Sequence, residues 1–525
     1  MTREASRSRS TNLSAGPGHP AQAPNGPAGP QRRLVPRPLT DRGRGWAVAL
    51  GLALIAGLVR LWNLGHPTDH GTPVFDEKHY VPQAWQMIRN GGVEDNPGYE
   101  LVVHPPLGKQ LIALGELALG YNGWGWRLSA ALAGTCCVLL IVRIVRRMTR
   151  STLLGGIAGV LLIVDGVSHV QSRIGMLDIF LTMFVLAAFG CLVIDREQVR
   201  ARLATVVREG RIDDTEFGPR LGVRWWRFGA GVLLGLACAT KWSGVYYLVA
   251  FAAMSLVWDA CARRTAGARR PWAGTAVRDL GPALWAMATV PLGAYLAMWW
   301  AWFGSETGID RHVVGDKIGS GGPFSFMPAP LRALWYYSAH VLDFHTGLTT
   351  PAKPHPWESK PWSWPMGLRP MLYYYESGPA ASGCGRGDCV SAVMLIGTPA
   401  LWWISLPVLG WSLWRAATTP DWRYGAALVG YAAGWLPWFI NIDRQMYFFY
   451  MAPVAPFLVI AVTLVLGELL GRVGDGTERQ GTGLLLVCIY LGLVVANFAW
   501  LWPILTGDSI TPGHWDAELW LPSWR

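Results

Sequence analysis

Two adjacent carboxylates, Asp76 and Glu77, are the side chains in this sequence best placed for proton transfer. They lie in the segment PVFDEKHY, residues 73–80, shortly after the first long apolar run at 46–62. Two neighbouring acids in isolation are most often part of a solvated turn. Here apolar and aromatic residues flank the pair at the end of an apolar run. We therefore interpret it as a site where a carboxylate accepts a proton from a hydroxyl.

Several other polar side chains lie next to an apolar run or in a loop rich in aromatic residues. These candidate substrate contacts are His104, Lys109, Arg173, Asp178, Lys241, His355 and Arg444. Charges at membrane depth are costly and usually have a function. Simpler interpretations stay open for some of them. A helix-end charge pair would account for Arg173 and Asp178. Snorkelling would account for Lys241, and an ordinary interfacial turn would account for Arg444.

One acid with several cations suits the displacement of a phosphate that joins a sugar to a long polyprenol. The lipid would keep the phosphosugar at the membrane surface while a carboxylate takes the proton from the incoming hydroxyl. Arg or Lys would stabilise the departing phosphate. Phosphate leaves readily as an anion, so a general acid is not needed, in contrast to glycoside hydrolysis with its two carboxylates. A single displacement would invert the anomeric carbon.

The composition indicates a polytopic membrane protein of the all-α class. The chain has 525 residues, of which 51% are hydrophobic and only 15% are charged. A soluble protein would carry roughly a quarter charged residues, and several apolar runs here reach the length of about 20 residues that crosses a bilayer. The net charge of +11 comes with arginines in short loops between apolar runs. This is the positive-inside pattern of membrane proteins and no argument for nucleic acid as a partner.

The apolar runs predict about eleven transmembrane helices within a catalytic domain at 45–503. Residues 1–44 are rich in Pro, Gly, Ala, Ser and Arg and are expected to form a disordered cytoplasmic tail. Two large extracytoplasmic loops are expected at about 65–125 and 303–390, with residues 504–525 also outside. Within them we expect a helix at Leu107–Leu119 near the interface, with a tilted span as the alternative. A span is expected at 391–414, and Lys241 should interrupt the apolar run at 228–260.

The eight cysteines divide into two groups. Six lie in or at the ends of apolar runs and are expected to pack without reacting. Cys384 and Cys389 flank a polar turn, and their spacing allows a disulfide if the loop is extracytoplasmic. We expect no metal and no cofactor, because two adjacent side chains in an extended segment do not readily face one ion.

Four motifs together resemble the protein O-mannosyltransferases, which are multispan GT-C glycosyltransferases. They are Phe75-Asp76-Glu77, HPPLGK at 104–109, SRIGMLD at 172–178 and KWSG at 241–244. The segment HPWESKPWSWP at 355–365 resembles the actinobacterial members. The resemblance covers nearly all of 45–503. It implies transfer of mannose from polyprenyl phosphate mannose to Ser/Thr hydroxyls of secreted proteins, at the outer face of a bacterial plasma membrane.

The resemblance also implies roles for individual residues. Asp76 would be the catalytic base, Glu77 would support the acceptor site, and Arg173 would contact the donor phosphate. Further substrate contacts would come from His104, Lys109, Lys241 and His355. The acceptor would be a Ser/Thr-rich polypeptide that leaves the secretion translocon. Eukaryotic members carry a β-trefoil-rich domain in the second outer loop, which is too short here to hold one, so the loop itself is a candidate for acceptor selection.

Two other functions fit parts of the pattern. One is a GT-C enzyme that glycosylates a lipid or glycan, as in aminoarabinose transfer to lipid A, because donor handling is shared. The other is a transporter, which would place ionisable groups near the midplane and show internal repeats. In this sequence the ionisable groups gather at one face and no repeat is evident, which favours the enzyme.

Overall fold

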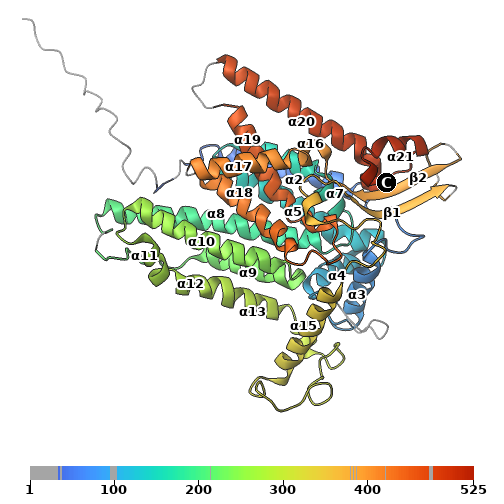
Figure 1. Ribbon diagram of the computed structural model, residues 1–525, viewed down its shortest axis with the longest axis horizontal. Helices are drawn as coiled ribbons and strands as arrows, with labels where there is room; N and C mark the ends of the chain where they lie inside the picture. The colour runs from blue at the N-terminus through green and yellow to red at the C-terminus, as the bar shows by residue number, and fades with distance from the viewer. Residues whose placement is uncertain are drawn as a thin grey trace, which may run out of the picture.

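The protein is a bundle of helices with one small β-hairpin, as the computed structural model in Figure 1 shows. The structure describes residues 34–35, 38–94, 103–212, 214–378, 380–381, 383–385, 387–419, 421–471 and 477–525. The disorder predicted for residues 1–44 falls largely outside these ranges. At the end of that predicted tail the first long helix already begins, at Arg42.

The helices before residue 305 include the long apolar segments of the N-terminal half. They are α2 (Arg42–Leu61), α3 (Glu77–Arg89), α4 (Leu107–Leu119), α5 (Gly123–Thr149), α6 (Thr152–Ile163), α7 (Gly166–Gln171), α8 (Asp178–Arg208), α9 (Trp225–Thr240), α10 (Gly244–Ala266), α11 (Pro271–Arg278), α12 (Leu280–Leu284), η1 (Trp285–Thr289), α13 (Val290–Ala297) and α14 (Trp300–Gly304). The helix predicted at Leu107–Leu119 is confirmed, and so is the break at Lys241, which separates α9 from α10.

The remaining elements include the hairpin, which follows α15 and η2. They are α15 (Ala329–Gly347), η2 (Pro361–Ser363), β1 (Met371–Gly378), β2 (Cys389–Leu395), α16 (Pro399–Trp402), α17 (Ser405–Thr418), α18 (Trp422–Trp435), η3 (Leu436–Phe439), η4 (Phe448–Met451), α19 (Ala455–Leu469), α20 (Thr477–Thr506), α21 (Pro512–Glu518) and η5 (Pro522–Trp524). The prediction of a helical span from 391 is wrong in its first part, because β2 occupies that stretch and pairs antiparallel with β1. A short apolar run fits a buried strand as well as a helix.

Six helices in the described part of the chain are long and apolar enough to cross a bilayer. They are α2, α5, α8, α10, α20 and the continuous helical segment Leu280–Ala297. Two shorter apolar helices, α6 and α19, accompany them. The chain is therefore a multi-pass membrane protein. The count of eleven spans stays a prediction, since several of the expected spans are shorter or interrupted helices in the structure.

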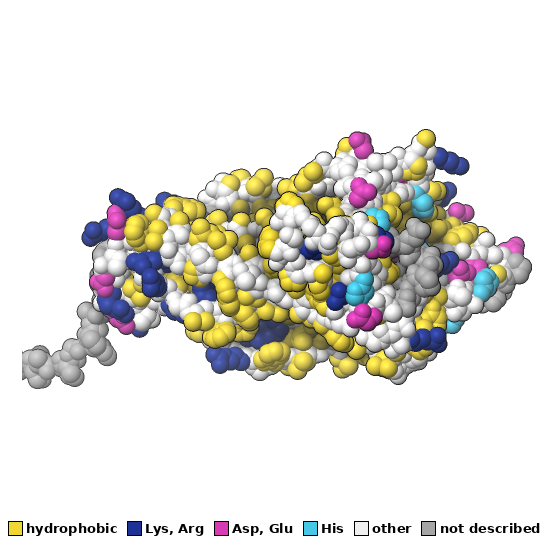
Figure 2. Space-filling view, turned by 90° about the horizontal axis from the view of Figure 1, so that it is seen from below, with side chains coloured by type: hydrophobic (Ala, Val, Ile, Leu, Met, Phe, Trp, Pro, Cys, Tyr) yellow, Lys and Arg dark blue, Asp and Glu magenta, His cyan; other side chains and the backbone are white. Residues whose placement is uncertain are grey.

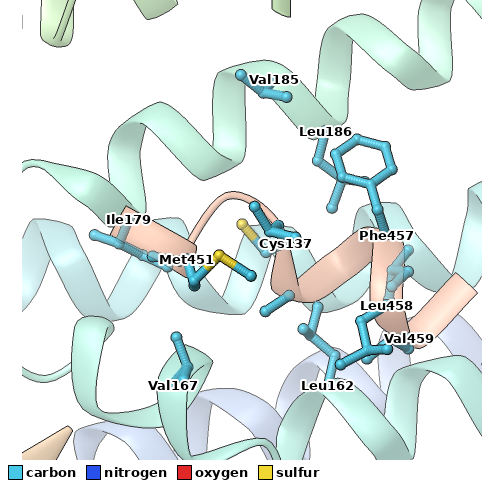
Figure 3. Packing of buried hydrophobic residues seen from close by; sticks show 14 of the residues in the cluster. Cys137, Leu162, Val167, Ile179, Val185, Leu186, Met451, Phe457, Leu458 and Val459 are labelled. Carbon is cyan, nitrogen blue, oxygen red and sulfur yellow. The ribbon is translucent and has the colours of Figure 1, made fainter. Parts of the chain in front are cut away.

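The core lies where α5, α6, α8 and α19 meet. Figure 3 shows the ring of Phe457 beside Leu186, and Leu162 near Val459 below Cys137. These side chains are almost fully buried, as are most residues of α19. A helix that is apolar on all sides belongs in the middle of a bundle. This arrangement makes α8 and α19 the rigid centre on which the polar ends are built.

Helices α2 and α5 run antiparallel and define two ends of the molecule. At one end Asp41 pairs with Arg146 at 2.7 Å, which explains why α2 starts earlier than predicted. At the other end Gly123 lies so close to Gly65 that an added Cβ would be 2.4 Å from the Gly65 carbonyl oxygen. On the face drawn in Figure 2, many Lys and Arg side chains gather at the left end, whereas the His side chains lie in the right half.

Candidate active site

The acid pair begins α3, and an uncommon backbone conformation precedes it. Phe75 has a φ of 49°, in the left-handed region that few non-glycine residues adopt. Its ring stacks on Tyr373 of β1 at 4.3 Å and lies 6.2 Å from the ring of Phe449. Such conformations persist where the surroundings hold them, and they concentrate at functional sites. The stacking fixes Phe75, and thereby the position of Asp76.

Asp76 is a half-buried carboxylate without a local partner. It occupies the N-cap position of α3, yet its side chain makes no capping hydrogen bond. Within the part of the chain that the structure describes, no residue donates a hydrogen bond to its carboxylate. Burial raises the pKa of Asp76, while the charges of His79 and Lys241 act in the opposite direction. A raised pKa and a free lone pair are the properties of a general base.

Glu77 has the opposite environment, because both of its oxygens are fully occupied. Arg127 donates to Oε1 at 2.7 Å and to Oε2 at 2.8 Å. The backbone N–H of Val74 donates to Oε2 at 3.1 Å, and that of Gly175 donates to Oε1 at 2.6 Å. Glu77 has no exposed surface. The bidentate pair ties the loop before α3 to α5 and to the segment before α8.

Lys241 and Asp178 form a buried ion pair behind Asp76. Lys241 Nζ lies 2.9 Å from Oδ1 and 3.0 Å from Oδ2 of Asp178. The ammonium group also lies over the rings of Phe449 and Tyr450, at 5.3 and 5.2 Å. The helix-end pair considered for Arg173 and Asp178 is therefore wrong, since Asp178 pairs across the bundle with Lys241 instead. The charges of both Lys241 and Asp178 act on the pKa of Asp76.

Arg444 is a cation with no acidic partner among the described residues. Its guanidinium lies over Trp438 at 5.5 Å and over Tyr450 at 5.8 Å. One terminal nitrogen approaches His345 Nδ1 at 3.5 Å, and its buried Nε has no hydrogen-bond partner. An uncompensated guanidinium with a free donor is suited to bind an anion.

Two histidines link Arg444 to the acid loop. His104 lies 5.4 Å from the ring of His345 and 5.8 Å from the ring of Tyr80. Burial, followed by the charge of Lys241, holds the pKa of His104 well below its usual range. Burial also lowers the pKa of His345. Both imidazoles are therefore neutral at neutral pH. We call Lys241, Arg444, His104 and His345 the basic cluster.

Residues between α15 and η2 hold Arg444 in place. The backbone on both sides of Arg444 pairs with residues 348–350 through hydrogen bonds of 3.0 and 2.8 Å. Lys360 donates to the carbonyl oxygens of Ile442 and Arg444, at 2.9 Å each, and forms an ion pair of 2.8 Å with Glu358. Segments remote in sequence thus position the guanidinium.

Lys109 and Arg173 support neighbouring backbone in the structure. Lys109 is fully buried, forms an ion pair with Glu94 and donates to the carbonyl oxygen of His104 at 3.1 Å. Arg173 donates to three carbonyl oxygens at the C-terminal end of α2, those of Arg60, Trp62 and Asn63. These contacts turn the guanidinium toward α2, and none of its hydrogen bonds to the described residues reaches the basic cluster. Its contact with a donor phosphate stays a prediction.

His355 is an exposed residue of the segment between α15 and η2. Its ring packs edge-on against Tyr447 at 5.5 Å, and its Nδ1 accepts the N–H of Trp357 at 3.2 Å. The structure joins Cys384 and Cys389 by the disulfide that their spacing allows. His355 is thus separated from the acid loop by aromatic side chains.

Some residues of the site were not singled out from the sequence. Arg127 had a readable signal, because it lies at the outer end of a predicted span, where the positive-inside pattern does not place arginine. No feature of the sequence distinguishes Tyr373, Phe449 and Tyr450, because aromatic residues are common in the predicted outer loops. No group of three metal-ligating side chains is present in the described ranges, and the expectation that no metal is needed stays a prediction.

Two family models match this chain and together span most of it. Residues 51–303 match the model described as Dolichyl-phosphate-mannose-protein mannosyltransferase. Residues 330–524 match the model described as the C-terminal four TMM region of protein-O-mannosyltransferase.

Curated relatives agree with the family models over nearly the whole length. The Polyprenol-phosphate-mannose--protein mannosyltransferase of Mycolicibacterium smegmatis is 57% identical over 488 residues, which is 92% of this chain and 94% of the relative. The protein of the same name from Corynebacterium glutamicum is 44% identical over 489 residues, 91% of this chain and 93% of the relative.

Among solved structures, the fold resembles a chain of the Saccharomyces cerevisiae protein O-mannosyltransferase Pmt1-Pmt2 complex bound to the sugar donor. The TM-score is 0.69 at 14% identity, with 93% of each chain covered. The Archaeoglobus fulgidus oligosaccharyltransferase in the apo form matches with a TM-score of 0.51 at 15% identity, over 91% of this chain and 57% of that chain. At these identities the likeness concerns the fold alone.

Proposed function

This chain belongs to the protein O-mannosyltransferase family, and on that premise we propose that it transfers mannose from a polyprenyl phosphate to Ser or Thr hydroxyls of secreted polypeptides. The observation that carries the proposal is a pair of unmatched opposite charges in one site. Asp76 is a carboxylate without a hydrogen-bond donor among the described residues, and Arg444 is a guanidinium without a carboxylate. The aromatic rings of Phe75, Phe449 and Tyr450 connect them.

In the proposed reaction, Asp76 takes the proton of the acceptor hydroxyl as its oxygen attacks the anomeric carbon of mannose. The new carbon–oxygen bond forms as the bond from that carbon to phosphate oxygen breaks, so the configuration inverts. A carboxylate near the surface, with its pKa raised by burial, is a better base than an ordinary exposed aspartate. A positioned base contributes a rate factor of roughly 10² to 10⁴.

The polyprenyl phosphate departs with the bonding electrons, and the basic cluster would stabilise it. Arg444 offers its unpartnered Nε, and its fork geometry matches phosphate. The carboxylate of Asp178 offsets the charge of Lys241, so the pair is close to neutral. Lys241 would therefore help to orient the phosphate more than to stabilise its charge. The neutral imidazole of His104 can donate one hydrogen bond to the phosphate. His345, whose Nε2 lies 3.0 Å from the carbonyl oxygen of Val103 and whose Nδ1 faces Arg444, would instead support the guanidinium.

Glu77 and Arg173 would act through other groups. Glu77 has no free lone pair that faces the site, so we assign it to positioning Asp76 through Arg127. Arg173 would fix the end of α2 beside the site. The acceptor support and donor contact that the family resemblance implies are the alternatives for these two residues.

The same topology supports a placement in the membrane. The end where Asp41 meets Arg146 is rich in Arg, so it would face the cytoplasm of a bacterium, with residues 1–44 on that side. The domain at 45–503 would then open its site on the outer face of the plasma membrane. Residues 504–525 would lie outside, since Trp515 packs on Tyr375 of the hairpin. Delivery of acceptors from the secretion translocon follows from that placement.

The test is transfer of labelled mannose from polyprenyl phosphate mannose by purified protein, with a Ser/Thr peptide and a glycolipid offered together. We expect labelled peptide, and a rate lower by roughly 10² to 10⁴ from the variant Asp76→Asn. Labelled glycolipid with unlabelled peptide would instead support the alternative in which a lipid or glycan is the acceptor. A fully active Asp76→Asn protein would overturn the assignment of the base.

A further inference from the structure

The hairpin β1–β2 reaches from the protein surface into the site. Its strands pair antiparallel from Met371 with Leu395 to Gly378 with Cys389, and the disulfide closes the turn beyond them. Near its base, Tyr373 stacks on Phe75, next to Asp76. The hydroxyl of Tyr373 accepts a hydrogen bond from Gln171 at 2.9 Å, which fixes the ring.

The two edges of the hairpin differ. The outer edge of β2 is occupied, because Val390 and Ile510 exchange two backbone hydrogen bonds of 2.8 and 2.9 Å. In Figure 1, β2 lies on the side of α21 and β1 lies on the far side. Over the ranges that the structure describes, the backbone of β1 makes no ladder with any strand except β2.

The free edge of β1 has little of the usual protection, namely one irregularity at its site end and one charged residue, Glu376. Natural edge strands are guarded by lysine, proline, bulges or a covering segment, because their unpaired N–H and C=O groups bind other strands. The sequence of β1, MLYYYESG, contains neither lysine nor proline, and its irregularity lies at the site end, between Leu372 and Tyr374. Toward the tip, Tyr375 is 48% exposed. An edge of this kind is suited to bind a partner strand.

We propose that the free edge of β1 binds the acceptor polypeptide as an added strand and so delivers a Ser or Thr hydroxyl to Asp76. The proposal rests on the proposed function, because it takes a polypeptide as the acceptor. A secreted chain that has not yet folded is extended and has unsatisfied backbone groups, which is what a sheet edge recognises.

The dimensions agree with this arrangement. An added strand lies about 4.8 Å from its neighbour and advances about 3.3 Å per residue. A residue opposite Tyr373 would therefore lie beside Phe75, one residue before Asp76 in the sequence. Beyond Tyr373, β1 continues from Tyr374 to Gly378. This stretch would pair with acceptor residues on only one side of the reacting Ser or Thr. Main-chain pairing would also allow acceptors of many sequences, since side chains contribute little to it.

The test is a scan of acceptor peptides in which one backbone amide at a time is N-methylated. In a strand, alternate N–H groups point toward the neighbouring strand. We expect KM to rise about fivefold to tenfold at every second residue, over about four residues on one side of the Ser or Thr, which corresponds to one lost hydrogen bond per position. The interleaved methylations are the matched controls and should leave KM nearly unchanged.

A second measurement uses the protein. Because alternate N–H groups face the free edge, one of the neighbouring variants Glu376→Pro and Ser377→Pro should raise the peptide KM, and hydrolysis of the donor without peptide should stay as in the unaltered protein. Equal sensitivity at all methylated positions, or none beyond the reacting residue, would overturn the strand model. Transfer to the unmethylated peptide tests the proposed function separately, so the two failures are distinguishable.

Discussion

The buried pair of Glu77 and Arg127 offers a sharp test of how the acid loop is held. Each oxygen of Glu77 accepts two hydrogen bonds, and Arg127 donates two of the four. Removing one partner of a buried ion pair costs about 3 to 5 kcal/mol, because the remaining charge is left uncompensated. We expect Glu77→Gln and Arg127→Met each to lower the free energy of unfolding by about that amount.

The double variant, Glu77→Gln with Arg127→Met, separates two roles for Glu77. It removes both charges, so no uncompensated buried charge remains and most of the lost stability should return. Transfer should stay low, because Val74 and Gly175 would no longer be tied to a carboxylate that is itself fixed by Arg127. We therefore expect stability and activity to separate in the double variant.

The assay is thermal unfolding of the purified protein alongside initial rates of mannose transfer. A matched control is Asp279→Asn, which breaks another buried pair, of Arg263 with Asp279 at 2.8 Å, at the other end of α10 from Lys241. It should lower stability to a similar extent and leave KM for both substrates unchanged. If Glu77→Gln left the stability intact but raised the acceptor KM, Glu77 would contact the acceptor and the positioning role would be refuted.

Four further predictions concern the site. Asp76→Asn should lower the rate by roughly 10² to 10⁴ without loss of stability, because burial raises the pKa of Asp76 and ionisation there opposes folding above that pKa. In the unaltered protein, Asp76 becomes protonated and stops acting as a base as the pH falls through this raised pKa. The midpoint of the acid limb of the rate profile should therefore lie above about 3.9, the pKa of an exposed aspartate. A midpoint at or below that value would contradict the burial argument. Arg444→Ala should reduce the rate of transfer by about 10² to 10³ and Arg444→Lys by less, and the affinity for the donor should fall while that for the acceptor should not. A donor affinity equal to that of the unaltered protein, measured by titration, would contradict this. Arg173→Ala should lower the unfolding temperature through the three lost bonds to α2 and leave donor KM unchanged, whereas a raised donor KM at full stability would favour direct contact with phosphate.

The interruptions and bounds of several elements were predictable from the sequence for local reasons. The break between α9 and α10 occurs at Lys241, where a charged residue divides a long apolar run. Helix α4 has the predicted bounds, because Pro106 and Gly120 flank it and favour helix ends. The strand β2 was not predictable, since a seven-residue apolar run has no period that separates a buried strand from a helix.

The partners of the charged residues were beyond sequence reasoning. Asp178 is near Arg173 in the sequence, yet it pairs with Lys241, which is 63 residues away. Arg444 approaches His345 across 99 residues, and Glu77 meets Arg127 across 50. Each pair depends on how whole helices pack against one another, and hydropathy carries no information about that.

By itself, the sequence determined that this is a multi-pass helical membrane protein and that an acid doublet follows its first apolar helix. Insertion into a bilayer depends on the local free energy of transfer of each segment, which can be read residue by residue. Only the tertiary structure decided that Asp76 is left without a partner while Glu77 is fully bonded, although the two are neighbours in the chain. That difference arises because long-range packing brings Arg127 and Gly175 to one carboxylate and aromatic rings to the side of the other.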